Sequence, residues 1–229
     1  MRRHLFRNGF LLATVFLLAG CGTTFKYHPK LGQTFPPISM ARGVEIAGGT
    51  DERPKDERRP VWSKSVESIV AHALGGEIQH DGLFPRVKIH LAGPSRLSKF
   101  SYYVQFRVEA FEMAPESGFA EKVGRSALLE SLGWRGALIS ASIPMTWRSQ
   151  VKVDFEIFDA QSKQMIFSRS YSETRSLKVN GYQGDSQQIQ QTSDCLEAVV
   201  GRFVADFSRL AGNSAREGEI RAEGQRRPT

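Results

Sequence analysis

The segment FSYYVQFRVEAFE, residues 100–112, has the clearest strand pattern in the chain, and the predicted fold is built outward from it. Apolar side chains occupy alternate positions, as in a strand that buries one face in a core and turns the other to water. We therefore predict a half-buried strand here. Its apolar face consists of Phe100, Tyr102, Val104, Phe106, Val108 and Ala110, and its polar face of Ser101, Gln105, Arg107 and Glu109.

Two later segments continue the same sheet. Residues 147–158, WRSQVKVDFEIF, alternate in the same way, and residues 159–163, DAQSK, have the composition of a turn. Because residues 165–171 return as another strand, we predict an antiparallel hairpin that forms a meander with the first strand. The inward side chains are Val151, Val153, Phe155 and Ile157 before the turn and Met165, Phe167 and Tyr171 after it.

The chain before this sheet begins with a short strand and a charged loop. Residues 43–47, GVEIA, predict the strand. Residues 48–60, GGTDERPKDERRP, are too rich in glycine, proline and charge to be anything but a loop.

A helix and a short strand follow this loop. The helix is predicted from Pro60 to Gly82, and Gly75-Gly76 indicates either close packing against a neighbour or an early fray. Residues 86–91, RVKIHL, alternate as in a half-buried strand. The apolar stripe of the helix is Trp62, Val66, Ile69, Val70, Ala73, Leu74 and Ile78.

The most regular helical pattern covers residues 187–211, where apolar residues recur at spacings of three and four. Asp185 or Ser186 can cap its start and Gly212 its end. Residues 213–229 have almost no apolar side chains, so we predict a disordered tail. The stripe consists of Ile189, Leu196, Val199, Val200, Phe203, Val204, Phe207 and Leu210.

These elements together predict a single α+β domain over residues 40–212. Its mostly antiparallel sheet of about five strands is packed by two main helices, in the order strand-helix-strand-strand-strand-strand-helix. A domain of this size buries a real core without disulfides or metals.

The first 21 residues, MRRHLFRNGFLLATVFLLAGC, have the features of a secretory signal. Arg2, Arg3 and Arg7 precede an apolar run that is too short to span a bilayer and ends at small residues. Leu18-Ala19-Gly20-Cys21 resembles the lipobox of bacterial lipoproteins.

The lipobox resemblance implies that residues 1–20 are removed and that Cys21 becomes a lipidated N-terminus. Diacylglycerol on its sulfur and an acyl chain such as palmitate on its amine would hold the protein at the bilayer, since one chain alone binds only marginally. In the sorting rule of enterobacterial lipoproteins, Gly22 instead of aspartate implies the outer membrane, with the domain facing the periplasm. Residues 21–39 carry prolines and no apolar period, as expected of a flexible tether.

Two short motifs extend the resemblance to the folded part. Asp51-Glu52-Arg53-Pro54 after the first strand and Asp81-Gly82-Leu83-Phe84 after the first helix are similar to motifs of small envelope lipoproteins, namely the YajG-like family and relatives that share the TolB amino-terminal fold. The first strand is shorter and less apolar than usual there, which leaves edge and central positions open. The resemblance implies an accessory or interaction role in envelope transport or assembly, and fold analogy alone gives no chemistry.

Composition argues against several other functions. The formal net charge of +7 includes three arginines of the signal, so the remaining excess is too small and too spread to indicate nucleic-acid binding. Cys195 is left without a disulfide partner once Cys21 is lipidated. The histidines show no metal-ligand spacing and no Gly-x-Ser-x-Gly elbow is present, so we predict no metal, no cofactor and no enzymatic activity.

Asp51, Arg53 and Pro54 could contact a partner. An aspartate and an arginine two residues apart in a turn more often bind each other and the backbone, so we favour a structural loop.

Residues 117–145 form an apolar insertion between two good strands, and three interpretations are open. The segment can fold back into the core, it can dip into the inner leaflet of the outer membrane, or it can dock a protein partner. The residues that would make a membrane or partner contact are Leu128, Leu129, Leu132, Trp134, Arg135, Leu138 and Ile139.

The sequence therefore favours a non-enzymatic outer-membrane lipoprotein that binds the bilayer through acylated Cys21 and an envelope protein through its domain. The alternative is a membrane-anchored carrier of lipid or another apolar ligand, with the insertion gating a pocket between sheet and helices. The sequence sets no oligomeric state.

Overall fold

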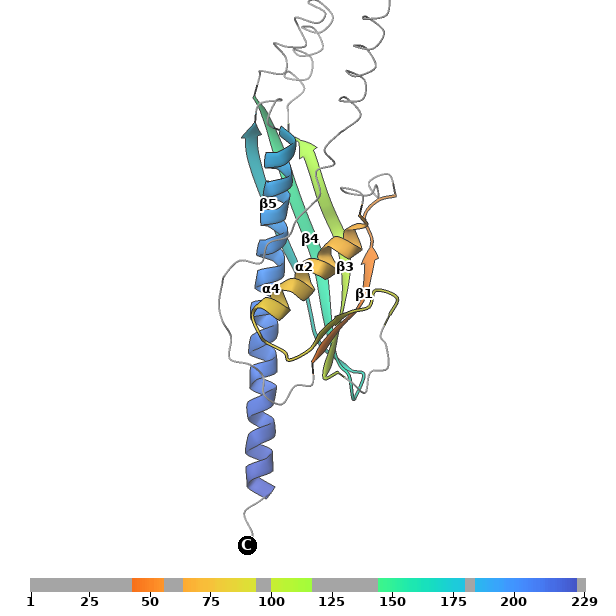
Figure 1. The fold of residues 1–229 in the computed structure, drawn as a ribbon, viewed down its shortest axis with the longest axis vertical. Helices are drawn as coiled ribbons and strands as arrows, with labels where there is room; N and C mark the ends of the chain where they lie inside the picture. Colours follow the sequence, from red (N-terminus) through yellow and green to blue (C-terminus); the bar gives the residue numbers. More distant parts are fainter. Residues whose placement is uncertain (1–42, 56–63, 94–99, 117–143, 180–183, 226–229) are drawn as a thin grey trace, which may run out of the picture.

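The computed structural model describes residues 43–55, 64–93, 100–116, 144–179 and 184–225, with only the backbone described for residues 184–186 and 214–225. The order of elements is the predicted one, and the α+β fold class is confirmed (Figure 1). The elements are β1 (Val44–Asp51), α2 (Val66–His80), β2 (Val87–Ile89), β3 (Tyr102–Pro115), β4 (Met145–Asp159), β5 (Met165–Val179) and α4 (Gly184–Gln225).

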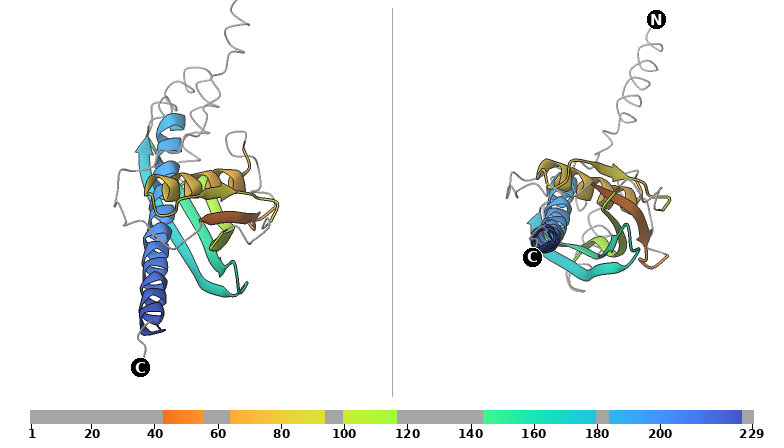
Figure 2. Two further views of the ribbon diagram at one scale, coloured as in Figure 1. Left: turned by 60° about the horizontal axis from the view of Figure 1, so that its bottom comes forward. Right: turned by 90° about the horizontal axis from the view of Figure 1, so that it is seen from below.

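The five strands form one sheet in the order β2-β1-β3-β4-β5. The long strands β3, β4 and β5 are antiparallel neighbours, as the meander predicts, whereas β1 runs parallel to both β2 and β3. The first strand therefore takes an interior position and not an edge. Helices α2 and α4 lie over the same face of the sheet, α2 against β1 and β2 and α4 against β4 and β5 (Figures 1 and 2).

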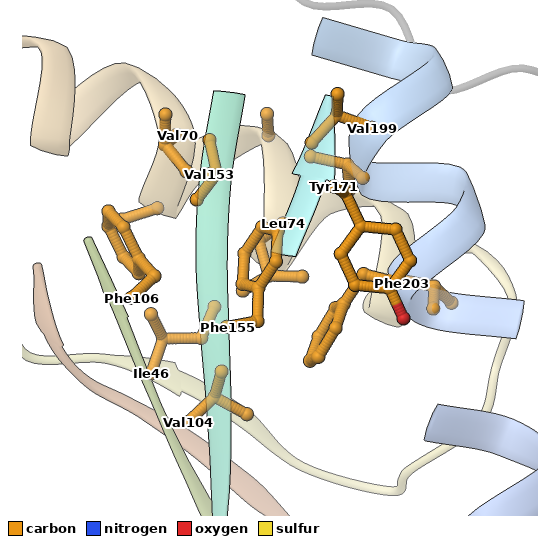
Figure 3. Close-up of a cluster of buried hydrophobic side chains, with 14 of the residues drawn as sticks. Ile46, Val70, Leu74, Val104, Phe106, Val153, Phe155, Tyr171, Val199 and Phe203 are labelled. Carbon is orange, nitrogen blue, oxygen red and sulfur yellow. The ribbon is translucent and has the colours of Figure 1, made fainter. Parts of the chain in front are cut away.

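The core lies between the sheet and the two helices. The inward side chains of β4 are all fully buried, and so is the stripe of α4 from Leu196 to Phe207. Phe155 of β4 stacks on Phe203 of α4 with ring centroids 4.2 Å apart, and the ring of Tyr171 lies beside them (Figure 3). The two periodic patterns, one of period two and one of 3.6, thus meet in a single aromatic layer.

Two bulges change which side chains face this core. The pairing of β3 with β4 shifts between Val108 and Ala110, so that Phe111 faces Val151 and joins the main core, while Ala110 faces Lys152 on the other side of the sheet. The predicted inward placement of Ala110 is therefore wrong, because one extra residue reverses the alternation beyond it.

A second bulge explains why Met165 does not face the core as predicted. The β4–β5 pairing is irregular at its start, where Ile157 faces Phe167 and Phe158 faces Met165. Phe167 turns inward as predicted, but Met165 lies on the opposite face and is 55% exposed. Strand β5 also continues eight residues beyond Tyr171, to Val179.

Strand β1 includes Gly48–Asp51, which the sequence assigns to the loop. A register shift between Ile46 and Gly48 lets the strand resume its pairing with β3 as far as Asp51, opposite Val108. The absence of a side chain at Gly49 makes room for a core ring, since a Cβ there would lie within 2.7 Å of Phe106 Cε2. Tertiary pairing therefore overrides the low strand propensity of two glycines.

We expect Gly49→Ala to lower the free energy of unfolding by about 1–3 kcal/mol, because the new methyl group would push the buried ring of Phe106 out of place. Gly48→Ala is the matched control, since its Cβ would come no closer than 3.8 Å to Gln105. Denaturant unfolding of both variants tests the prediction, and equal stabilities would contradict the close approach.

Helix α2 begins later than predicted and ends where predicted. Ser65 is the N-cap and its hydroxyl accepts a hydrogen bond from the backbone N–H of Ser68, so the helix does not start at Pro60. Gly82 follows the C-cap with a positive φ of +64°, a conformation that favours glycine. A Cβ on Gly75 would lie 2.9 Å from Ile89 Cδ1, so this glycine marks close packing against the sheet and not a fray.

Helix α4 is longer at both ends than its apolar stripe. It begins at Gly184, which places Asp185 and Ser186 within its first turn, and it continues past Gly212 to Gln225. The predicted disorder from residue 213 is therefore wrong as far as Gln225; alanine, arginine and glutamate, which are good helix formers, dominate this stretch. Within the described ranges, no helix combines the length and apolarity that a membrane crossing needs.

Candidate functional site

Most of the predicted contact residues lie outside the described part of the chain. Leu18, Ala19, Gly20 and Cys21 fall in residues 1–42, and the apolar insertion falls in residues 117–143 except for its last two positions. Their roles stay predictions. The insertion residues concerned are Leu128, Leu129, Leu132, Trp134, Arg135, Leu138 and Ile139.

The Asp51–Arg53 pair lies at the end of β1 and fastens the following loop to β3. Arg53 Nη2 lies 2.7 Å from Asp51 Oδ2, and Arg53 Nε donates to Asp51 Oδ1 at 2.8 Å. Arg53 Nη1 also donates to the backbone carbonyl of Phe111 at 3.3 Å. The Arg53 side chain is only 3% exposed, whereas Pro54 is exposed. The two charged groups thus act on each other and on the neighbouring strand.

Cys195 packs in the core against β4. It is fully buried, and its Sγ lies 3.8 Å from the carbonyl oxygen of Ser149 as a weak donor. Burial raises the pKa of its thiol to about 11, so the group stays protonated at neutral pH. It therefore packs as a small hydrophobic side chain.

One surface hollow, of about 380 Å³, lies where β1 extends beyond the short β2. Gly48, Gly49 and Thr50 form its floor with Gln105 and Arg107 of β3. Arg107 Nη2 donates to Glu156 Oε1 at 2.8 Å, so the charge of this arginine is already balanced inside the hollow. We assign no ligand to it.

A second hollow, of about 420 Å³, lies between β5 and α4, and we call it the arginine hollow. The alternation of β5 turns Arg169 and Tyr171 toward the helix. On α4, spacings of four and three place Arg202, Asp206 and Arg209 on one side, next to the core stripe. Ser170, Ser172 and Ala205 complete the lining.

Asp206 organises the charges of the arginine hollow. Its Oδ2 accepts hydrogen bonds from Tyr171 Oη at 2.7 Å and from Arg169 Nη1 at 2.8 Å. Its Oδ1 lies 3.2 Å from Arg209 Nη2. Burial, followed by the bond to Asp206, raises the pKa of Tyr171 well above its ordinary value, so its hydroxyl remains a donor at neutral pH. Two guanidinium groups are therefore held at one carboxylate.

Arg202 lies at the rim of the hollow and binds the main chain of β5. Its Nη2 donates to the carbonyl oxygen of Ser172 at 2.7 Å and to Glu173 Oε2 at 3.0 Å, and its Nε donates to the carbonyl oxygen of Ala198 at 3.1 Å. Because β5 is the outermost strand, this guanidinium caps a main-chain acceptor of the sheet edge.

Sequence reasoning misses the arginine hollow. The hydrogen bond between Arg169 and Asp206 joins residues 37 positions apart, and the pattern of β5 is followed only to Tyr171. The signal that could find it is the combination of charged residues at inward positions of a strand with an Arg-x-x-x-Asp-x-x-Arg spacing beside the stripe of the last helix.

No protein-family model matches this chain, and no curated protein matches its sequence. Solved structures with a related course of the backbone include a Xanthomonas campestris protein of the DUF330 family, with 10% identity, a TM-score of 0.47 and coverage of 87% of this chain and 96% of that one. Lipoprotein GNA1162 of Neisseria meningitidis has 9% identity, a TM-score of 0.36 and coverage of 71% and 98%. A minor lipoprotein of Acinetobacter baumannii has 12% identity, a TM-score of 0.31 and coverage of 74% and 93%.

Proposed function

We propose that this protein is a non-enzymatic lipoprotein of the outer membrane, anchored through acylated Cys21, whose periplasmic domain binds a component of an envelope assembly or transport system. The observation that carries the proposal is the sequence Leu18-Ala19-Gly20-Cys21 behind a basic and apolar leader. Such a leader supplies membrane attachment by itself, so the domain is free to serve as a tethered binding module.

The packing of the domain favours a binding module over a lipid carrier. A carrier of apolar ligands would need a pocket between the sheet and the helices. In the described part of the molecule, this space is filled by fully buried side chains, among them Phe155 and Phe203 (Figure 3) and also Phe207. The two hollows described above lie at the surface and outside this core; the arginine hollow is lined mostly by polar and charged residues, and the other has a mixed lining.

Replacing Cys21 with serine tests the anchor. We expect the parent protein in the outer-membrane fraction with acyl chains on its N-terminal peptide, and the Cys21→Ser variant to be lost from that fraction because no sulfur remains to be acylated. Membrane fractionation and mass spectrometry of the N-terminal peptide measure both. Cys195→Ser is the matched control, since this thiol is buried in the core and should leave the fractionation unchanged. A Cys21→Ser protein that stays in the outer membrane refutes the anchor.

Photo-crosslinking in cells tests the binding role. A probe at Trp134, in the apolar insertion, is expected to give a discrete adduct with an envelope protein, identified by mass spectrometry. A probe at Gln161, in the exposed β4–β5 turn, is the control and should give none. The same diffuse pattern from both positions would contradict a docking role for the insertion.

A further inference from the structure

We propose that the arginine hollow between β5 and α4 is a binding site for a phosphate group. This site is separate from the proposed membrane anchor at Cys21 and from the apolar insertion, and all the residues that form it belong to β5 and α4. Three guanidinium groups line the hollow, from Arg169 on β5 and from Arg202 and Arg209 on α4. One carboxylate, that of Asp206, lies among them.

The hollow keeps positive charge after its internal ion pairs are formed. Asp206 balances one of the two guanidinium groups that it holds, and Glu173 pairs with Arg202 and with Arg175, which also pairs with Asp194. Since the Asp206 side chain is only 16% exposed and has a guanidinium group beside each of its oxygens, it repels an incoming anion less than a free carboxylate would. The lining is therefore cationic on balance.

Donors for a ligand remain on both outer arginines. Arg169 contacts Asp206 through Nη1, and Arg209 contacts it through Nη2. Among the described contacts, Nε and Nη2 of Arg169 and Nε and Nη1 of Arg209 therefore remain for a ligand. Their side chains are 61% and 74% exposed, which keeps these donors accessible from solvent. A guanidinium fork matches two oxygens of a phosphate.

The hollow is built before a ligand arrives. Tyr171 is buried, donates to Asp206 and has the Arg169 guanidinium 5.6 Å from its ring centroid, so strand and helix hold the carboxylate and the first arginine from both sides. A ligand then meets an Arg169 that is already placed, which lowers the entropy cost of binding.

A compact anion fits this geometry better than an acidic peptide strand. A peptide that extended the sheet would need the main chain of β5, but Arg202 already occupies the carbonyl oxygen of Ser172 at the rim of the hollow. The phosphate can belong to a phospholipid headgroup or to a small soluble molecule, because both present the same tetrahedral oxygens.

Calorimetric titration of the full chain, held in a neutral detergent, tests the proposal with two probes. Inorganic phosphate represents a soluble source, and monomeric short-chain phosphatidylglycerol represents a lipid headgroup. We expect saturable binding of at least one probe, weakened by added salt. Binding of both assigns the site to the phosphate group itself, and binding of only one assigns it to that source.

The variants locate the site. Arg169→Ala with Arg209→Ala should weaken binding about tenfold or more, whereas the lysine double variant, Arg169→Lys with Arg209→Lys, should retain part of it because the charge stays and the fork is lost. Arg148→Ala, which removes an exposed arginine of β4 away from the hollow, is the control for loss of a surface arginine elsewhere and should bind as the parent does.

Three outcomes would overturn the proposal. They are the absence of saturable binding for both probes, equal binding by the alanine double variant and the parent, and binding of a polyglutamate peptide with no binding of either phosphate probe. Because the arginines concerned are exposed, circular dichroism of the variants should match the parent, and the result stays interpretable whether or not the membrane anchor is correct.

Discussion

Replacing Phe203 with alanine is expected to lower the free energy of unfolding by about 3–5 kcal/mol, the largest effect of any single side chain in the core. Phe203 is fully buried and stacks on Phe155, and its ring also lies within 6.1 Å of Tyr171 and 5.8 Å of Phe207, centroid to centroid. The variant would leave a cavity at the point where α4 meets β4 and β5, so strand and helix would lose their main contact together.

Denaturant unfolding followed by circular dichroism measures this loss. Met165→Ala is the control, since its side chain is 55% exposed and removing it should change stability by no more than about 0.5 kcal/mol. A Phe203→Ala variant as stable as Met165→Ala would mean that the aromatic layer does not hold α4 to the sheet.

Arg53→Met is the second large effect, and we expect a loss of about 3 kcal/mol. The substitution removes the guanidinium that lies 2.7 Å from the carboxylate of Asp51, which is 11% exposed, and it removes the arginine donor to the carbonyl of Phe111. Changing both partners, Asp51→Asn with Arg53→Met, should recover most of the loss, because the side chain that faced Arg53 is then neutral as well.

A double-mutant cycle on these variants measures the coupling between the two side chains. The exposed pair of Arg107 and Glu156 provides the comparison, and its removal should cost less than about 1 kcal/mol. If the two cycles gave equal coupling energies, burial of Arg53 would not be the reason for the effect.

The sequence predicts well those parts of the fold in which the spacing of apolar residues keeps one periodicity throughout the element. Residues 151–157 alternate without a break, and the stripe from Leu196 to Phe207 repeats every three or four positions, so the inward side chains follow directly. The element order follows from these segments and the turns between them.

The errors arise where tertiary contacts decide. The bulges beside Ala110 and Met165 change the face of the sheet on which these side chains lie, and nothing in the local composition indicates a bulge. Gly48-Gly49 has the composition of a loop and belongs to a strand only because it pairs with β3. At the end of α4, Gly212 reads as a stop although the residues after it favour a helix.

The candidate site depends on both kinds of information. The sequence identifies Asp51 and Arg53 as a pair, because two residues apart in a turn is a local relation. It does not identify the arginine hollow, because Arg169 and Asp206 come together only through the packing of α4 on β5. Lipidation of Cys21 and contacts of the apolar insertion remain predictions.

The interior position of β1 has a mechanical consequence if the protein is held through Cys21, as we propose. The first described strand is bonded on one side to β2 and on the other to β3, both parallel to it. Tension along β1 would load two evenly spaced rows of hydrogen bonds at the same time, whereas tension on an edge strand could break the hydrogen bonds of its single row one after another. A force applied at the N-terminal end of the domain would thus act on a strand that is hydrogen-bonded on both sides.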